Sequence, residues 1–152
     1  MQSRMPNVIA LVPDALKALY AVGKAAKSGG LPETTAILVH LRASQINGCS
    51  FCCQMHFAEM RKAGESDDRL ATVAAWREAP YFTDAERAAL ALTEAVTRLS
   101  DRPDPVPDAI WSEAARHFDE PALAALLLEI SLINVWNRLN VATQQPAGAA
   151  WK

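Results

Sequence analysis

The sequence predicts a single all-α domain, and three observations support that fold class. Apolar residues recur at helical spacing along the chain, while no stretch shows the strict alternation typical of strands. Proline, glycine and capping residues mark the starts and ends of these segments. The length of 152 residues fits one domain, and 51% hydrophobic with 21% charged residues is an ordinary globular composition. We therefore expect one unit of about six or seven helices.

The first two helices follow a lead-in over residues 1–12 that we expect to be irregular. Pro13 suits the first position of a helix, because its missing N–H would be unpaired there, and Ser28-Gly29-Gly30 ends this helix. Leu31-Pro32-Glu33 opens the second helix, whose apolar residues recur with helical period up to Asn47-Gly48.

Two shorter helices come next. One begins near Cys49 and ends at Ala63-Gly64, where Gly64 suits the left-handed conformation of a C-cap. Ser66 caps the other, which stops before Pro80.

Three helices are expected in the C-terminal half. Thr83-Asp84-Ala85-Glu86 is a capping box, which predicts a helix over residues 84–99. A linker with two prolines at 100–105 separates it from a helix at 107–118. Asp119 caps a long last helix to about residue 141, and the tail after it is expected to be loose. This last helix is apolar nearly all round, which indicates burial on more than one side.

Charge and hydropathy exclude several classes of function. The net charge of −2, without a cluster of Lys or Arg, argues against a nucleic-acid partner. No long apolar run precedes Pro13, so we expect no signal peptide, and no run approaches the ~20 apolar residues of a membrane span. The sequence therefore predicts a soluble, cytoplasmic protein without a membrane partner.

The chemistry-bearing residues gather in one short segment, Cys49, Cys52, Cys53 and His56. On a helix that starts near Cys49, these side chains fall within one narrow sector. The first turn of that helix has unpaired backbone N–H groups and the positive end of the helix dipole, and both favour a thiolate. Cysteines packed this tightly in a reducing compartment are usually catalytic or metal-binding.

The spacing Cys-x-x-Cys-x-x-x-His predicts a dithiol redox centre. A thiolate attacks an O–O or S–S bond and leaves a sulfenic acid or a mixed disulfide. A second thiol one turn away closes a disulfide, while His56 takes or returns the protons. An outside thiol donor must then reduce the disulfide, and this chemistry needs no cofactor and no metal.

Two other interpretations of the cluster remain open. The cysteines could be small buried hydrophobes on a core-facing stripe. They could also form a zinc site with His56, although structural zinc usually needs a second ligand pair on a distant segment. The remaining histidines offer no such pair, since His40 suits a helix-surface or partly buried position and His117 suits the last turn of its helix.

Residues 38–49, with Cys52 and His56 after them, carry a wider pattern. Further matching segments are 63–65, 76–79, 82–83, 86–94 and 133–138. Together they resemble the alkylhydroperoxidase AhpD-like branch of the carboxymuconolactone decarboxylase family, over about residues 13–142. The resemblance implies an all-helical domain that assembles into trimers, or into hexamers built from dimers. It also implies antioxidant, peroxidase-type reduction of hydroperoxides with electrons from an external thiol or dithiol donor.

The resemblance also implies roles for the site residues. Cys52 corresponds to the cysteine that attacks the peroxide, Cys49 to the one that resolves it, and His56 to the histidine of the proton relay. Two positions depart from the family pattern. Ile37 stands where the relay commonly has a glutamate, and Phe51 stands where some members have a histidine or tyrosine.

These departures leave two questions open. A relay without its carboxylate activates the thiol less, which favours a rival hypothesis of a dithiol sensor or binding protein with little turnover. Glu33, one helical turn before Ile37, or Gln45 could replace the carboxylate in part. Cys53 is an addition to the motif, and a buried small residue is its favoured interpretation over a catalytic one.

The segment from Asn134 to Arg138 is unusual for an apolar helix. Buried amide and guanidinium groups need hydrogen-bond partners. We therefore expect this segment to bond to other helices or to a neighbouring subunit, with substrate contact as the alternative.

Overall fold

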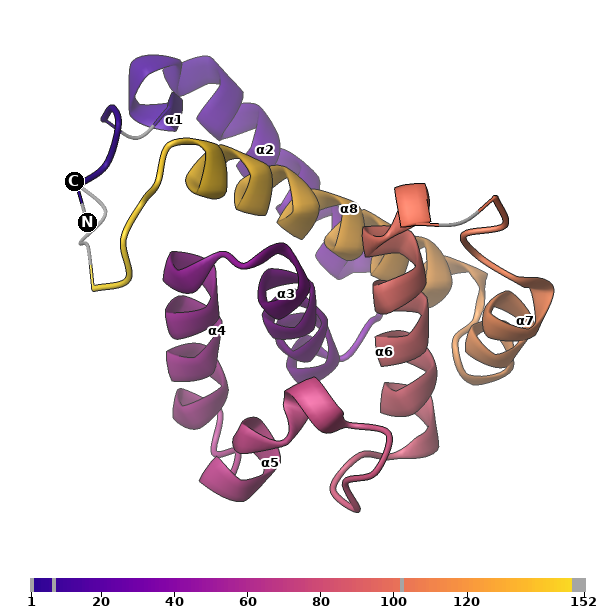
Figure 1. Cartoon of the computed structure of the whole chain (residues 1–152). Coiled ribbons are helices and arrows are strands. Elements are labelled where there is room, and N and C mark those ends of the chain that lie inside the picture. The colour runs from indigo at the N-terminus through magenta and orange to yellow at the C-terminus, as the bar shows by residue number, and fades with distance from the viewer. Residues whose placement is uncertain (1, 7, 102, 149–152) are drawn as a thin grey trace.

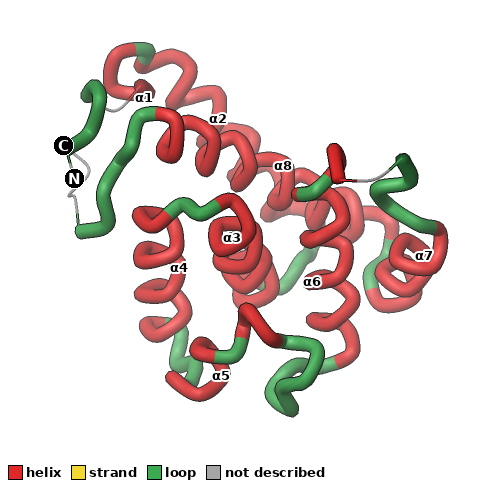
Figure 2. Tube along the Cα trace, in the orientation of Figure 1, coloured by secondary structure: helices red, strands yellow, loops and turns green. Residues whose placement is uncertain are grey.

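The structure, a computed structural model, describes residues 2–6, 8–101 and 103–148. All regular structure within these residues is helical, which confirms the predicted all-α fold (Figures 1 and 2). The α-helices are α1 (Val8–Leu11), α2 (Pro13–Ala26), α3 (Glu33–Asn47), α4 (Ser50–Lys62), α5 (Asp67–Ala71), α6 (Asp84–Thr97), α7 (Asp108–His117) and α8 (Glu120–Ala142). Short 3-10 turns lie at Lys27–Gly29, Val73–Ala75 and Leu99–Asp101.

The sequence signals placed most helix ends within a few residues. Thr83 and Glu86 form the expected reciprocal capping box, and the Asp119 carboxylate accepts the Ala122 N–H at 2.9 Å. Two segments differ from expectation. The helix α1 lies in the segment expected to be irregular, and α5 ends at Ala71 instead of continuing toward Pro80. The hydroxyl of Thr72 donates to the Arg69 carbonyl oxygen at 3.0 Å, a bond that competes with continued helix.

Helix α3 lies at the centre of the fold, between α4 and α6, and α8 packs across it (Figure 1). Helix α2 runs along α8, and α7 packs against α6. Consecutive residues of α3 point into two different core clusters. Leu38 packs with the cluster under α4 and α5, while Val39 packs with the cluster formed by α6, α7 and α8. This central position of α3 fixes its C-terminal end, where the cysteine segment begins.

A buried carboxylate ties α3 to α6. Glu94 on α6 accepts hydrogen bonds from Arg42 of α3 (2.7 Å from Nη2), from the Trp76 indole (2.9 Å) and from Arg77 (2.9 Å). Burial alone would raise the pKa of Glu94, but these hydrogen bonds outweigh it and hold the pKa below its usual value. Glu94 is therefore ionised in the folded protein, as a buried carboxylate with several donors should be.

Helix α8 is the longest element and, by length and composition alone, is apolar enough to cross a membrane, contrary to the sequence-based expectation. Half of its most apolar stretch is buried inside the fold, and the core helix of a soluble protein passes the same test of length and composition. The segment after α8 was expected to be loose, but it makes hydrogen bonds to the rest of the chain. Gln145 donates a side-chain hydrogen bond to the Met5 carbonyl oxygen, and the Gly148 N–H bonds to Gln54 of α4.

Candidate functional site

The site begins at the sharp junction between α3 and α4. Gly48 ends α3 with a φ of 68°, a left-handed conformation that favours glycine. Cys49 follows as the N-cap of α4, and its Sγ accepts the backbone N–H of Cys52 at 3.3 Å. The expected helix start near Cys49 is therefore confirmed. A sulfur atom occupies the position where serine or aspartate oxygen usually caps a helix.

Cys49 and Cys52 form a disulfide with a Cα–Cα distance of 5.3 Å, within the usual range for such bonds. Their side chains are buried, with Cys49 2% and Cys52 1% exposed. Cys53 is a free, half-buried thiol that packs against the cluster around Leu38. Burial raises the pKa of the Cys53 thiol, which makes it a weaker nucleophile at neutral pH. Its surroundings match the interpretation of a packed small residue.

His56 lies one turn after Cys52 and is only 5% exposed. Its Nδ1 lies 2.7 Å from Glu59 Oε2, and the hydrogen bond from His56 keeps the pKa of Glu59 below its usual value. An ionised carboxylate can only accept, so Nδ1 carries the proton and Nε2 has the basic lone pair. Burial lowers the pKa of His56 despite Glu59, which keeps the ring neutral near pH 7. Within the described residues this buried Nε2 has no hydrogen-bond partner.

The carboxylate at this site comes from a position that sequence reasoning missed. Ile37 lines a cavity wall near His56, while Glu33 forms an exposed ion pair with Lys27 at 3.3 Å. Gln45 accepts a hydrogen bond from Arg42 at 3.3 Å. Instead Glu59, three residues after His56 on the same helix, meets the imidazole. The i, i+3 spacing on one helix was the signal that could have identified it.

A second histidine–carboxylate pair lies beside the first. The ring of His40 on α3 is tilted by 54° to that of His56, with 4.9 Å between the ring centroids. His40 Nε2 lies 2.9 Å from Oε2 of Glu129, a buried residue of α8. His40 is partly buried, as its helix position suggested, whereas His117 pairs with Glu113 on the surface at 3.1 Å.

A cavity of about 990 Å³ lies between α2, α3, α4 and α8. The two histidines and their glutamates line it on one side, while Leu19, Tyr20, Leu132 and Trp136 contribute apolar walls. The cysteines are not among the described residues that line this cavity. The imidazoles of His40 and His56 therefore line the cavity, whereas the sulfur atoms of Cys49 and Cys52 are buried and do not line it.

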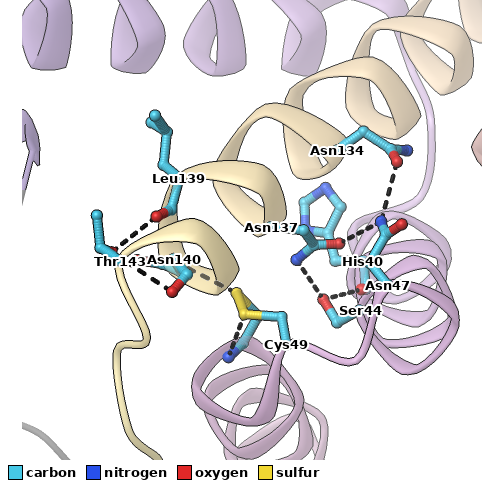
Figure 3. The surroundings of a disulfide bond; sticks show 10 residues. His40, Ser44, Asn47, Cys49, Asn134, Asn137, Leu139, Asn140 and Thr143 are labelled. Carbon is cyan, nitrogen blue, oxygen red and sulfur yellow. Dashed lines mark hydrogen bonds between the residues drawn. A yellow bond between two sulfur atoms is a disulfide. The ribbon is translucent and has the colours of Figure 1, made fainter. Parts of the chain in front are cut away.

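A row of buried asparagines on α8 faces the α3–α4 junction (Figure 3). Asn47 at the end of α3 donates to the side-chain oxygens of both Asn134 and Asn137, at 2.9 Å each. Asn137 donates to Ser44 Oγ at 3.0 Å, and Asn140 donates to Cys52 Sγ at 3.4 Å. The expectation that these amides bond to other helices is confirmed.

Arg138 does not share this environment. Its side chain is exposed on the single chain, and contact of this segment with a neighbouring subunit stays a prediction. Among the described residues, no three His, Cys, Asp or Glu side chains are arranged to hold a metal ion.

The comparisons with known proteins agree with this fold. Residues 13–95 match the carboxymuconolactone decarboxylase family. The chain is 36% identical over 132 residues to uncharacterized protein YdfG of Bacillus subtilis (strain 168), which covers 87% of this chain and 88% of that protein. A crystal structure from Agrobacterium tumefaciens, ATU0492, named a putative antioxidant defence protein AhpD, has a TM-score of 0.89 and 34% identity, over 98% of this chain and 100% of that one. The debrominase Bmp8 has a TM-score of 0.80 over 93% of this chain and 74% of its own, but at 19% identity this likeness shows the fold alone.

Proposed function

We propose that this chain, which belongs to the carboxymuconolactone decarboxylase family and to its AhpD-like branch, is a thiol-dependent peroxidase that reduces organic hydroperoxides. One observation carries the proposal. Cys49 and Cys52 are close enough to share a disulfide at the start of α4, and His56 on the same helix has its basic nitrogen unpaired and buried. A dithiol with a neutral imidazole one helical turn away on the same helix supplies the nucleophile, the resolving thiol and the base for two-electron reduction of a peroxide.

The reaction proceeds in balanced steps. His56 takes the thiol proton of Cys52, and the Cys52 thiolate attacks one peroxide oxygen of the hydroperoxide. A S–O bond forms, the O–O bond breaks, and the leaving alkoxide takes the proton from the imidazolium. The sulfur of Cys49 then attacks the Cys52 sulfenic acid, so that the S–S bond forms and water leaves. An external dithiol supplies the two electrons that reduce the disulfide.

The carboxylate of Glu59 supports this cycle through His56. It holds Nδ1–H and so leaves the lone pair on Nε2, and its negative charge favours the imidazolium formed after proton transfer. Burial keeps the resting ring neutral, so His56 can act as a base near pH 7. In this proposal Glu59 takes the part that the family glutamate plays elsewhere.

The cavity supports an organic substrate over hydrogen peroxide. Its volume of about 990 Å³ is in the range of sites for whole organic molecules, and its walls include Leu19, Leu132 and Trp136. Apolar walls favour a hydrocarbon substituent because they remove it from water. Since both sulfur atoms are buried in the disulfide form, the peroxide group reaches Cys52 only when neighbouring side chains move in the reduced protein.

We also propose a homo-oligomer, a trimer or a hexamer, that works in the cytoplasm. Exposed apolar side chains on α2 and α8 favour contact between subunits, among them Tyr20, Val22, Leu128, Val135 and Val141. A reducing compartment supplies the thiol donor that the cycle needs. Light scattering of the purified protein measures the assembly directly.

A thiol count tests the proposed function. The reduced protein is mixed with an aryl hydroperoxide or hydrogen peroxide, with and without a small dithiol, and free thiols and remaining peroxide are measured. Rapid loss of the Cys49 and Cys52 thiols with recycling by the dithiol supports the peroxidase. Slow loss without recycling supports a sensor, and no loss contradicts any redox role.

Variants of the same assay assign the sulfur atoms. Cys52→Ser should abolish peroxide consumption, while Cys49→Ser should complete one attack and stop as a sulfenic acid that a dimedone-type reagent labels. Cys53→Ser is the matched control and should turn over like the parent protein. Unchanged turnover in Cys52→Ser would exclude the proposed attacker.

A further inference from the structure

Asn140 lies in the last turn of α8, is 4% exposed, and donates a side-chain N–H to Cys52 Sγ at 3.4 Å (Figure 3). We propose that Asn140 is a positioning residue whose amide holds this sulfur and favours its thiolate, so that Cys52 instead of Cys49 attacks the substrate. The inference deepens the proposed function and rests on it for the identity of the reaction. Its physical content, an amide that stabilises one of two thiolates, is independent of the substrate.

The need for such a residue follows from the geometry of α4. Cys49 is the N-cap, and its sulfur already accepts the backbone N–H of Cys52 at 3.3 Å. Helix N-termini favour an anion at this position through unpaired N–H groups and the helix dipole. On these interactions alone, Cys49 would be the more acidic thiol of the pair. His56 can take the Cys52 proton, but a donor at the Cys52 sulfur is what would stabilise that thiolate once it has formed.

Asn140 is the donor that the described structure offers to Cys52 Sγ from outside α4. A neutral amide suits a buried sulfur, because it brings a partial positive charge without the desolvation cost of a full one. Hydrogen bonds to a charged acceptor are stronger than those to a neutral one. The same N–H therefore stabilises the Cys52 thiolate more than the Cys52 thiol or the disulfide.

The rest of the asparagine row holds this donor in place. Asn134 and Asn137 precede Asn140 at intervals of three residues and both bond to Asn47, while Asn137 also reaches Ser44. These contacts fix α8 against the residues that lead into Cys49. The amide of Asn140 is thus preorganised, and little reorganisation is needed when charge develops on the sulfur.

The test measures the thiolate of Cys52 without any peroxide. In a background with Cys49→Ser and Cys53→Ser, Cys52 is the sole thiol, and its ultraviolet absorbance is followed against pH. Asn140→Leu should raise the pKa of Cys52 by about one unit, with about a ten-fold slower alkylation at neutral pH. Thr143→Val is the control for the last turn of α8, since it removes a hydroxyl that bonds to the backbone carbonyl oxygens of Leu139 and Asn140 and leaves the Asn140 side-chain amide in place.

A second measurement avoids any change at Asn140. With Asn140 itself unchanged, the side-chain amide resonance of this residue should shift with pH along the same curve as the Cys52 thiolate. A folded Asn140→Leu protein with an unchanged Cys52 pKa overturns the inference. An equal shift in Thr143→Val, or an amide resonance insensitive to the thiolate, does the same. If these titrations behave as expected but no hydroperoxide is consumed, the proposed function fails and the role of Asn140 stands.

Discussion

The contact between Glu59 and His56 gives the sharpest prediction for the proposed chemistry. Glu59→Gln keeps an oxygen that can accept the Nδ1–H of His56 and removes only the negative charge. The tautomer with a basic Nε2 is therefore retained, while the imidazolium loses its stabilising partner. Glu59→Leu removes both the charge and the acceptor. Comparison of the two variants separates the electrostatic effect from the control of the tautomer.

The magnitude follows from the exposure of the pair. A hydrogen bond to a charged group contributes about 1.5–3 kcal/mol when well shielded. The side chain of Glu59 is 47% exposed, so solvent screening reduces the effect of its charge to about 1 kcal/mol. We therefore expect kcat/KM of Glu59→Gln to fall about five-fold, and that of Glu59→Leu to fall further.

The pH profile gives a second, independent readout. His56 must be neutral to accept a thiol proton, so activity is lost as the pH falls through its pKa. Burial lowers that pKa, and the hydrogen bond that His56 donates to Glu59 partly raises it again. Removal of the Glu59 charge therefore lowers the pKa of His56 further. The acid limb of the kcat/KM profile should move to lower pH in Glu59→Gln.

The assay is dithiol-dependent consumption of an organic hydroperoxide between about pH 5 and pH 8, where a histidine titrates. Glu33→Gln is the matched control, because Glu33 also lines the cavity but pairs with Lys27 on the surface. Parent-like rates and an unmoved acid limb in both Glu59 variants would show that His56 and Glu59 do not act as the base.

Two further predictions concern stability. Glu94→Ala leaves the buried guanidinium of Arg42 without its carboxylate and should lower the free energy of unfolding by about 3 kcal/mol in urea titrations. The folded-state pKa of Glu94 is lowered, so its contribution is present above the unfolded pKa and is lost as the pH falls through the folded one. The difference in free energy of unfolding between the parent protein and Glu94→Ala should therefore become smaller in acid. A difference that does not change with pH would contradict the ion pair between Glu94 and Arg42. Gly29→Ala places a Cβ 2.5 Å from the Pro121 carbonyl oxygen on α8. It should lower the free energy of unfolding by about 1–3 kcal/mol in the same urea titrations. An unchanged free energy of unfolding would mean that α8 shifts at no cost to make room for the methyl group.

Local signals were enough to predict most of the fold. Pro13, the capping box at Thr83 and the cap at Asp119 each act on residues within one turn, so a single sequence contains the whole interaction. The errors arose where a local signal was weak or was outcompeted. The helix α1 is only four residues long, too short for its apolar residues to show helical spacing, and α5 stops where the Thr72 hydroxyl competes for a helix carbonyl.

In the candidate site too, contacts between residues close in sequence were predictable, and contacts between distant residues were not. The spacing of Cys49, Cys52 and His56 placed them together on one helix because helical geometry relates neighbours in sequence directly. Asn140 reaches Cys52 across 88 positions of the chain, and Glu129 reaches His40 across 89. Such contacts depend on how α8 crosses α3. That crossing is set by packing over the whole core and not by any motif.

The structure offers an explanation for the apolar residue at position 37, where the resembled family commonly has a glutamate. On the proposed function, a carboxylate at Nδ1 assists the base at Nε2, and this role depends on a point in space and not on a position in the sequence. Glu59 satisfies it from α4, one turn beyond His56. Position 37 is then free to be apolar, and Ile37 lines the cavity that ends at the two histidines. The substitution that removes an acid from α3 therefore also extends the apolar wall, which on the proposed function favours an organic hydroperoxide over hydrogen peroxide.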